Sequence, residues 1–189
     1  FIQSTIRSLQ GQDYPPGKVE FVICDGLSTD GTREIVQQLA SADDRIRLID
    51  NPGIRSSAGR NAGFRAATGD IMLVIDGHVR IFDDQLLRNV ARAFQTSGAA
   101  CLGRSQPLIP GDSAWSQAIA LARGSKLGHS PSSFIFDNYS GFAPAASFGA
   151  AYKAEIFREV GYVDEQFDAC EDLEFNTRID KARLRCFVE

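Results

Sequence analysis

Two short apolar runs that each end at an aspartate constrain the fold of this chain more than any other feature. Residues 19–24 and 71–75 are rich in Val, Ile and other apolar residues, and Asp25 and Asp76 follow them directly. Neither run shows clean alternation of apolar and polar residues. This pattern indicates strands that are covered on both faces, as in a parallel sheet.

Strand and helix patterns alternate through the first half of the chain. A helix over residues 1–10 should end at the glycine and proline cluster of residues 11–17. We expect further helices at residues 33–40 and 56–67, and from Asp83 or Asp84 to about residue 96. Strands are expected at residues 19–24, 46–49, 70–76 and 99–103. This alternation predicts an α/β fold with a Rossmann-like, doubly wound and mostly parallel sheet.

The second half has a less regular pattern. Residues 124–149 are rich in Gly, Ser, Pro and Phe, and we expect a long loop there, either a binding loop or mobile surface. A short strand and helix should follow at residues 151–160, then an acidic connection at 164–168. A helix at residues 171–182 that starts with Glu171 and Asp172, and a strand at 184–189, complete the pattern.

Composition excludes several classes of protein. The chain has 189 residues, 43% hydrophobic and 23% charged, which suits one globular domain. A formal net charge of −4 argues against binding nucleic acid or anionic membrane by bulk electrostatics. No apolar run approaches the roughly 20 residues that cross a bilayer. The four scattered cysteines indicate reduced thiols in the cytoplasm rather than a disulfide framework.

Both ends of the sequence suggest a truncated chain. It starts at Phe1, without a methionine and already in a helical pattern, and it ends in a strand pattern. We therefore expect segments to be missing on both sides.

The aspartates at the strand ends are the first candidates for a binding site. Ligands of open parallel sheets bind beyond the carboxyl ends of the strands, so Asp25 and Asp76 could lie at one edge. Each is followed by glycine, however, and Asp-Gly is a common turn pair that needs no ligand. Either aspartate alone therefore favours a turn.

An ordered series of motifs favours a binding site instead. The motifs are Asp25-Gly26-Leu27-Ser28, Gly59-Arg60-Asn61, Thr68-Gly69-Asp70, Asp76-Gly77-His78 and Glu171-Asp172-Leu173-Glu174. Together they resemble the family-2 glycosyltransferases of the GT-A fold, especially those that build bacterial exopolysaccharides such as succinoglycan. The resemblance spans nearly the whole chain. It implies one catalytic domain, with a nucleotide-sugar half at residues 1–105 and an acceptor half at residues 106–189.

The resemblance implies a role for each motif on the donor side. Asp25 would bind the nucleotide base, and Arg60 would reach the ribose or diphosphate, although a solvated helix face is the alternative for Arg60. Asp76 would contact the nucleotide and, with His78, hold a divalent cation where the family has its D-x-D motif. Because His78 replaces a carboxylate, Mn²⁺ is favoured over Mg²⁺.

On the acceptor side, the resemblance assigns the general base to Asp172, with Glu171 binding the acceptor or orienting the base. The alternative is that both acids only favour the positive end of a helix. The implied enzyme is an inverting glycosyltransferase that moves a sugar from a nucleotide-sugar, expected to be a UDP-sugar, to a glycan or lipid-linked acceptor in polysaccharide synthesis. Membrane association could come from segments outside this chain, at the inner face of the cell membrane. Two alternatives stay open: a non-catalytic sugar- or partner-binding domain of this fold, and a sugar-phosphate nucleotidyltransferase.

Overall fold

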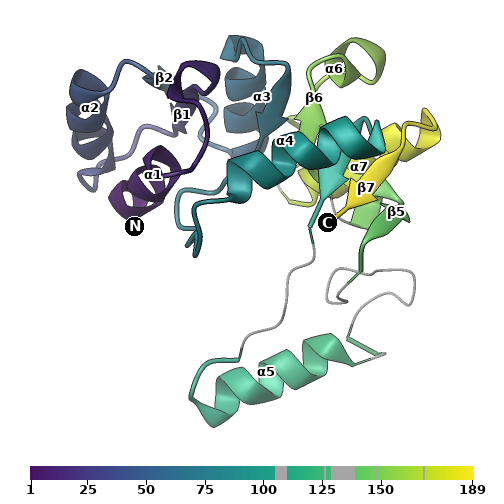
Figure 1. Cartoon of the computed structure of the whole chain (residues 1–189). Helices are drawn as coiled ribbons and strands as arrows, with labels where there is room; N and C mark the ends of the chain where they lie inside the picture. Colours follow the sequence, from purple (N-terminus) through teal and green to yellow (C-terminus); the bar gives the residue numbers. More distant parts are fainter. Residues whose placement is uncertain (105–109, 126, 129–138, 148, 168) are drawn as a thin grey trace.

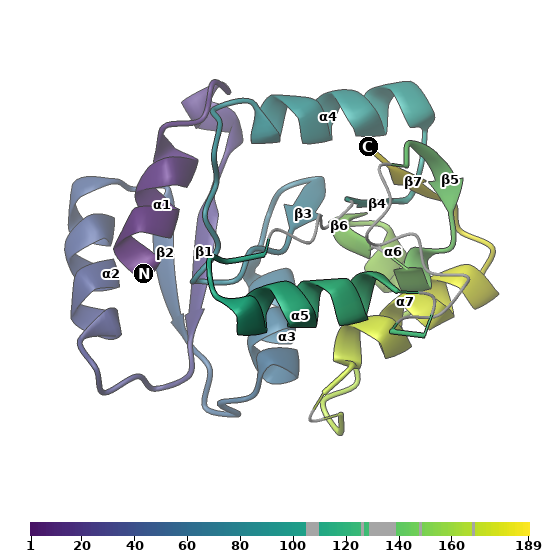
Figure 2. The ribbon, with the colours of Figure 1, turned by 90° about the horizontal axis from the view of Figure 1, so that it is seen from below.

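The structure is a computed structural model that describes residues 1–104, 110–125, 127–128, 139–147, 149–167 and 169–189. Its strands form two sheets. A two-stranded sheet has the order β1-β2, and a five-stranded sheet has the order β3-β6-β4-β7-β5. Figures 1 and 2 show α1, α2 and the small sheet at one end of the molecule, with α7 and the larger sheet at the other.

The small sheet and two helices build the first core. β1 (Phe21–Asp25) and β2 (Ile46–Asp50) pair in parallel, with Asp25 opposite Asp50. α1 (Ile2–Gln10) and α2 (Thr32–Ala42) contribute apolar faces at helical spacing, and the short 3₁₀ turn η1 (Pro16–Lys18) precedes β1. The buried side chains are Ile6, Phe21, Val36, Leu39 and Ile46. Each contributes roughly 1.5–3 kcal/mol by its burial.

The larger sheet is mixed. β3 (Ile71–Leu73) and β4 (Cys101–Gly103) both run antiparallel to β6 (Gly149–Lys153), which lies between them. β7 (Cys186–Val188) runs parallel to β4 and antiparallel to β5 (Gly141–Ala143). The α/β class is confirmed, but the described pairings are less parallel than the sequence suggested. Short buried strands of either direction have the same apolar pattern, so the sequence could not give the direction of β6.

Helices cover both faces of this sheet around β6. Because successive strand residues point to opposite faces, Ala151 and Tyr152 enter different clusters. Tyr152 packs with Phe64 of α3 (Ser56–Ala66) and Phe175 of α7 (Glu171–Lys181). Ala151 packs with Phe94 of α4 (Leu86–Ser97). The sheet thus fixes α3 and α7 on one face and α4 on the other.

Most predicted elements are confirmed, with differences in detail. The predicted strand at residues 70–76 is shorter, because β3 ends at Leu73. α4 begins after Gln85 without a side-chain cap, since Asp83 instead accepts a hydrogen bond from the backbone N–H of Gln85. The expected loop at 124–149 contains β5, η2 (Ala145–Ser147) and the start of β6, while residues 126, 129–138 and 148 lie outside the described part.

Two helices complete the described elements. α6 (Ile156–Glu159) follows β6, as expected. α5 (Ala114–Gly124) was not predicted, and it lies apart from the rest of the described chain in Figure 1. No helix in the described part has the length and apolarity needed to cross a membrane.

Candidate active site

A cleft of about 490 Å³ lies between α3, α7, α4 and the segment that follows β3. Arg60, Asp76 and Asp172 all line it. These residues are far apart in the sequence and come from three different elements. The structure therefore brings together three of the six residues that the sequence singled out.

Asp25 lies at the carboxyl end of β1, outside the lining of this cleft, and is 5% exposed. Its Oδ2 accepts a hydrogen bond from the backbone N–H of Ser28 (3.1 Å) and pairs with Arg33 (3.2 Å), which also pairs with Asp50 (2.6 Å). Hydrogen bonds from Ser28 lower the pKa of Asp25; burial opposes them, and Arg33 adds to them, so the net pKa is below its usual value. Asp25 is thus held as a carboxylate.

The two loops beside Asp25 have strained backbones. Leu27 follows β1 with φ 64° and Ile54 follows β2 with φ 63°, both in the left-handed region that side-chain-bearing residues rarely adopt. The loops also touch, because a Cβ on Gly26 would lie 3.1 Å from the carbonyl oxygen of Ile54. Both Leu27 and Ile54 are exposed. Backbone strain of this kind clusters at functional sites, and no sequence pattern predicted it here.

Arg60 and Glu171 join α3 to α7. Arg60 Nη1 lies 3.1 Å from Glu171 Oε1, and the hydroxyl of Ser56 donates to the same oxygen at 2.6 Å. Burial alone would raise the pKa of Glu171. The Ser56 hydrogen bond, the residue's own backbone N–H and the charge of Arg60 outweigh burial and hold this pKa below its usual value. Glu171 is thus an ionised, 7% exposed group that binds α3.

Asp172 differs from its neighbour in both exposure and direction. It is exposed in the first turn of α7 and lines the cleft, while its Oδ1 accepts a hydrogen bond from the backbone N–H of Leu173 at 2.8 Å. Cys170, just before the helix, has φ 61°. The paired acids therefore have separate surroundings: Glu171 is bonded to α3, and Asp172 is open to the cleft.

Asp76 and His78 lie in a turn that α1 supports. The backbone N–H of Val79 donates to the carbonyl of Asp76 (3.1 Å), and the Thr5 hydroxyl lies 3.1 Å and 2.9 Å from the carbonyls of Gly77 and Val79. Asp76 and His78 are both exposed, but only Asp76 lines the cleft. The turn thus carries one carboxylate to the cleft.

The turn that carries Asp76 and His78 is the candidate metal site. Within the described residues, no group of three or more His, Cys, Asp or Glu side chains could hold a metal ion. One carboxylate and one imidazole fit a cation such as Mn²⁺ only if a bound diphosphate and water supply its other ligands. The donor set suits a cation shared with a nucleotide, not a metal held by the protein alone.

The cleft also contains residues that sequence reasoning missed. Arg80 and Arg104 line it and add positive charge. Tyr152 and Asn176 line it too, and the hydroxyl of Tyr152 donates to Asn176 Oδ1 at 2.9 Å, both residues being 3% exposed. Burial raises the pKa of Tyr152. The predicted helix at residues 171–182 includes Asn176, but the spacing of Asn176 in that helix does not indicate a hydrogen bond to the strand residue Tyr152.

Comparisons with known proteins agree with this arrangement. Residues 1–161 match the family model described as Glycosyl transferase family 2. The succinoglycan biosynthesis protein ExoA of Rhizobium meliloti is 35% identical over 189 residues, which cover 99% of this chain and 56% of that protein. The chain thus spans about half the length of the curated relatives it matches.

Solved structures show the same fold. S. aureus TarS 1-349 in complex with UDP-GlcNAc superposes with a TM-score of 0.74 at 18% identity, covering 100% of this chain and 52% of that one. The mannosyltransferase PcManGT from Pyrobaculum calidifontis, in complex with GDP-Man and Mn²⁺, gives 0.67 at 23% identity with the same coverage. The GT-A-type fold and the family expected from the motifs are confirmed: the chain belongs to glycosyl transferase family 2.

Proposed function

We propose that this chain is the catalytic part of an inverting glycosyltransferase of polysaccharide synthesis. It would transfer a sugar from a UDP-sugar to a glycan or lipid-linked acceptor. The observation that carries the proposal is that Arg60, Asp76 and Asp172 line one cleft. Binding a diphosphate requires a positively charged side chain, here Arg60, and a carboxylate, here Asp76. Removing a proton requires an exposed carboxylate, here Asp172 at the start of α7.

The donor would lie between α3 and the turn after β3. Arg60 keeps guanidinium N–H groups beyond the one that faces Glu171, and these can donate to diphosphate oxygens. Asp25, ionised at the end of β1, would accept a hydrogen bond from the nucleotide base. A divalent cation shared by Asp76, His78 and the diphosphate would supply neutralising charge to the leaving group.

The acceptor would approach Asp172 from the open side of the cleft. An acceptor hydroxyl oxygen forms the new bond to the anomeric carbon and its proton passes to Asp172, while the bond from that carbon to the diphosphate oxygen breaks. Attack and departure on opposite sides of the sugar invert the anomeric centre. No enzyme nucleophile is needed, and Glu171 serves to orient α7 rather than to bind the acceptor.

The UDP assignment draws on TarS, which was solved with UDP and with UDP-GlcNAc. PcManGT was solved with GDP-Man and Mn²⁺, so the same fold also accepts guanine. ExoA is named for succinoglycan biosynthesis, which supports an exopolysaccharide product. We place the enzyme in the cytoplasm, at the inner face of the membrane, with any anchor supplied by segments outside this chain.

Ligand-dependent thermal stability tests the donor assignment. UDP, GDP, CMP and their sugars are added with and without Mn²⁺, to wild type and to Asp25→Asn. A ligand at about 100 times its Kd adds roughly 2.7 kcal/mol, which raises the Tm by several degrees. We expect a shift with uridine nucleotides that Mn²⁺ increases and that Asp25→Asn reduces.

Other outcomes point to different functions. A shift with guanosine nucleotides alone would reject UDP but keep the enzyme class. Pyrophosphate release from a nucleoside triphosphate would support the nucleotidyltransferase. If no nucleotide or nucleotide-sugar shifts the Tm, in the full-length protein as well, the result would support the non-catalytic domain.

A further inference from the structure

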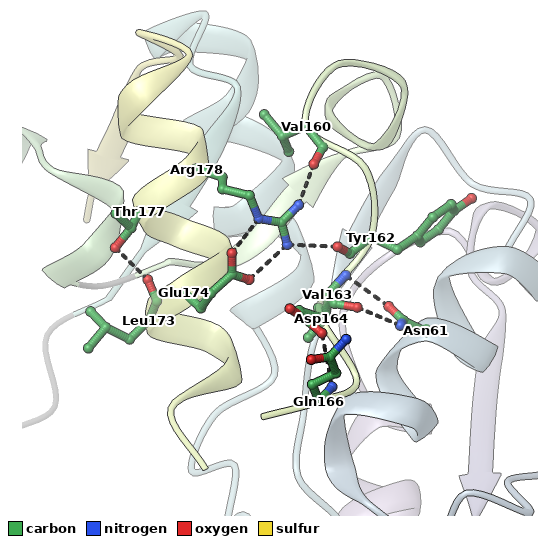
Figure 3. Close-up of polar contacts among 10 residues, drawn as sticks. All are labelled: Asn61, Val160, Tyr162, Val163, Asp164, Gln166, Leu173, Glu174, Thr177 and Arg178. Carbon is green, nitrogen blue, oxygen red and sulfur yellow. Dashed lines mark hydrogen bonds and ion pairs between the residues drawn. The ribbon is translucent and has the colours of Figure 1, made fainter. Parts of the chain in front are cut away.

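The segment that leads from α6 to α7 is held from two sides. Asn61 of α3 contacts residues 163 and 165, and Arg178 of α7 contacts residues 160 and 162. Figure 3 shows the contacts of Asn61 with Val163 and of Arg178 with Val160 and Tyr162. We call Asn61, Arg178 and the segment 160–165 between them the α3–α7 clamp. The Asn61 contacts join residues more than 100 positions apart along the chain, whereas the Arg178 contacts span 18 and 16 positions.

Asn61 makes contacts that require a side chain that both donates and accepts hydrogen bonds. Its Nδ2 donates to the carbonyl of Val163 at 2.8 Å, and its Oδ1 accepts from the backbone N–H of Val163 at 3.0 Å. Nδ2 also donates to Glu165 Oε1 at 2.7 Å, and Asn61 is 1% exposed. A carboxylate could accept but not donate here, and an apolar side chain could do neither. The amide therefore fixes residue 163 against α3.

All three guanidinium nitrogens of Arg178 donate hydrogen bonds. Nε and Nη2 donate to the two carboxylate oxygens of Glu174 at 2.6 Å and 2.9 Å, in a bidentate pair. Nη2 also donates to the carbonyl of Tyr162 at 2.7 Å, and Nη1 donates to the carbonyl of Val160. A lysine would keep the charge but lose this planar fork. The segment is thus tied to α7 by a group that only arginine supplies.

The clamp lies next to groups that the proposed reaction needs. Asn61 directly follows Arg60, and Val163 lines the cleft with Arg60 and Asp172. The clamped segment continues into the connection that starts α7 at Glu171. A shift of the segment would therefore change the separation between the donor side of the cleft on α3 and the acid on α7.

We propose that Asn61 and Arg178 are positioning residues: through the segment 160–165 they set where Asp172 lies relative to the donor bound beside Arg60. The inference rests on the proposed function, because it assigns the clamp to the geometry of that transfer. Misplacing a reacting group by about 1 Å can lower a rate about 100-fold. The clamp thus acts on turnover rather than on donor affinity.

The test compares Arg178→Lys and Asn61→Asp with Arg158→Lys, an exposed arginine on α6, in the full-length protein. Folding is checked by Tm, and donor Kd, transfer kcat and donor hydrolysis are measured separately. We expect both clamp variants to lower kcat at least about tenfold, to keep donor Kd within about twofold, and to lose more donor to water per transfer. Arg158→Lys should match wild type in all of these.

A double-mutant comparison separates positioning from general stability. In the Asp172→Asn background, Arg178→Lys should cause less than about twofold further loss, because the group it positions is already absent. An equal loss in both backgrounds, or a fall in kcat matched by loss of folded protein, would overturn the proposal. So would unchanged kcat in the two clamp variants.

A measurement without substrate distinguishes failure of the clamp from failure of the proposed function. If wild type transfers no sugar, the proposed function fails, whereas the clamp still predicts faster amide exchange at residues 171–175. We expect Arg178→Lys to speed that exchange at least about tenfold while the amides of α2 stay unchanged. Unchanged exchange at residues 171–175 would reject the clamp whatever the activity.

Discussion

Arg60 and Glu171 form an ion pair of 3.1 Å that joins α3 to α7 at the edge of the cleft. The Ser56 hydroxyl donates to the same carboxylate oxygen, and the side chain of Glu171 is only 9% exposed. Such a carboxylate has little freedom to meet an acceptor. Its neighbour Asp172 is exposed, so the two adjacent acids divide the tasks of holding the helix and facing the cleft.

Removing the charge of Glu171 should destabilise the fold. Glu171→Gln leaves Arg60 without its carboxylate, and leaving a buried polar group poorly satisfied costs about 1–3 kcal/mol. Urea denaturation measures the change, with Glu159→Gln on the exposed side of α6 as the control. An unfolding free energy equal to that of wild type would show that the pair contributes nothing.

The pKa of Asp25 predicts a pH-dependent stability difference. Its folded-state value lies below the usual 3.8, so its carboxylate stabilises the fold above about pH 4, and that contribution is lost as pH falls through the folded-state pKa. Wild type should therefore exceed Asp25→Asn in unfolding free energy at neutral pH, and the difference should shrink in acid. Denaturation at several pH values measures this, with exposed Asp44→Asn as the control. A difference that grows as the pH falls would contradict the assignment.

Asp172→Asn should lower turnover strongly while preserving donor binding. A general base contributes about 100- to 10,000-fold, and the amide cannot take the acceptor proton. Because Asp172 is exposed and bonded only to the adjacent backbone N–H among the contacts described, the variant should fold normally. Transfer kinetics and donor calorimetry measure the two effects, with Asp112→Asn as the control. Undiminished kcat would move the base to another residue of the cleft.

Local patterns explain why much of the fold was predictable. The apolar runs that became β1 and β2 are bounded by turn residues, and the spacing of Ile2, Ile6 and Leu9 shows the buried side of α1. Strand direction depends instead on how distant segments meet, so the strand at β6 was predicted but its antiparallel direction was not. α5 had one local signal, Ser113, whose Oγ accepts from the backbone N–H of Ser116 at 3.1 Å.

In the candidate site, too, local motifs were predictable and contacts between distant residues were not. Asp76 and Asp172 were found because each lies in a short motif at an element's end. The contacts that hold α3 to Glu171 and to the segment before α7 were not found, since Ser56 meets Glu171 across 115 positions and Asn61 meets Val163 across 102. Sequence proximity says nothing about such pairs, and only the packing of α3 against α7 creates them.

The strained loop beside Asp25 gives a last prediction. Ile54 has φ 63° and is 67% exposed, so its side chain contributes little packing while its backbone conformation costs about 1–2 kcal/mol. Glycine adopts this conformation freely but loses roughly 0.5–1 kcal/mol of chain entropy. Ile54→Gly should therefore raise the unfolding free energy by about 0.5–1 kcal/mol by urea denaturation. Leu127→Gly, at a fully exposed residue outside the left-handed region, should give no such gain. If Ile54→Gly is instead destabilising, the Ile54 side chain contributes contacts that outweigh the strain.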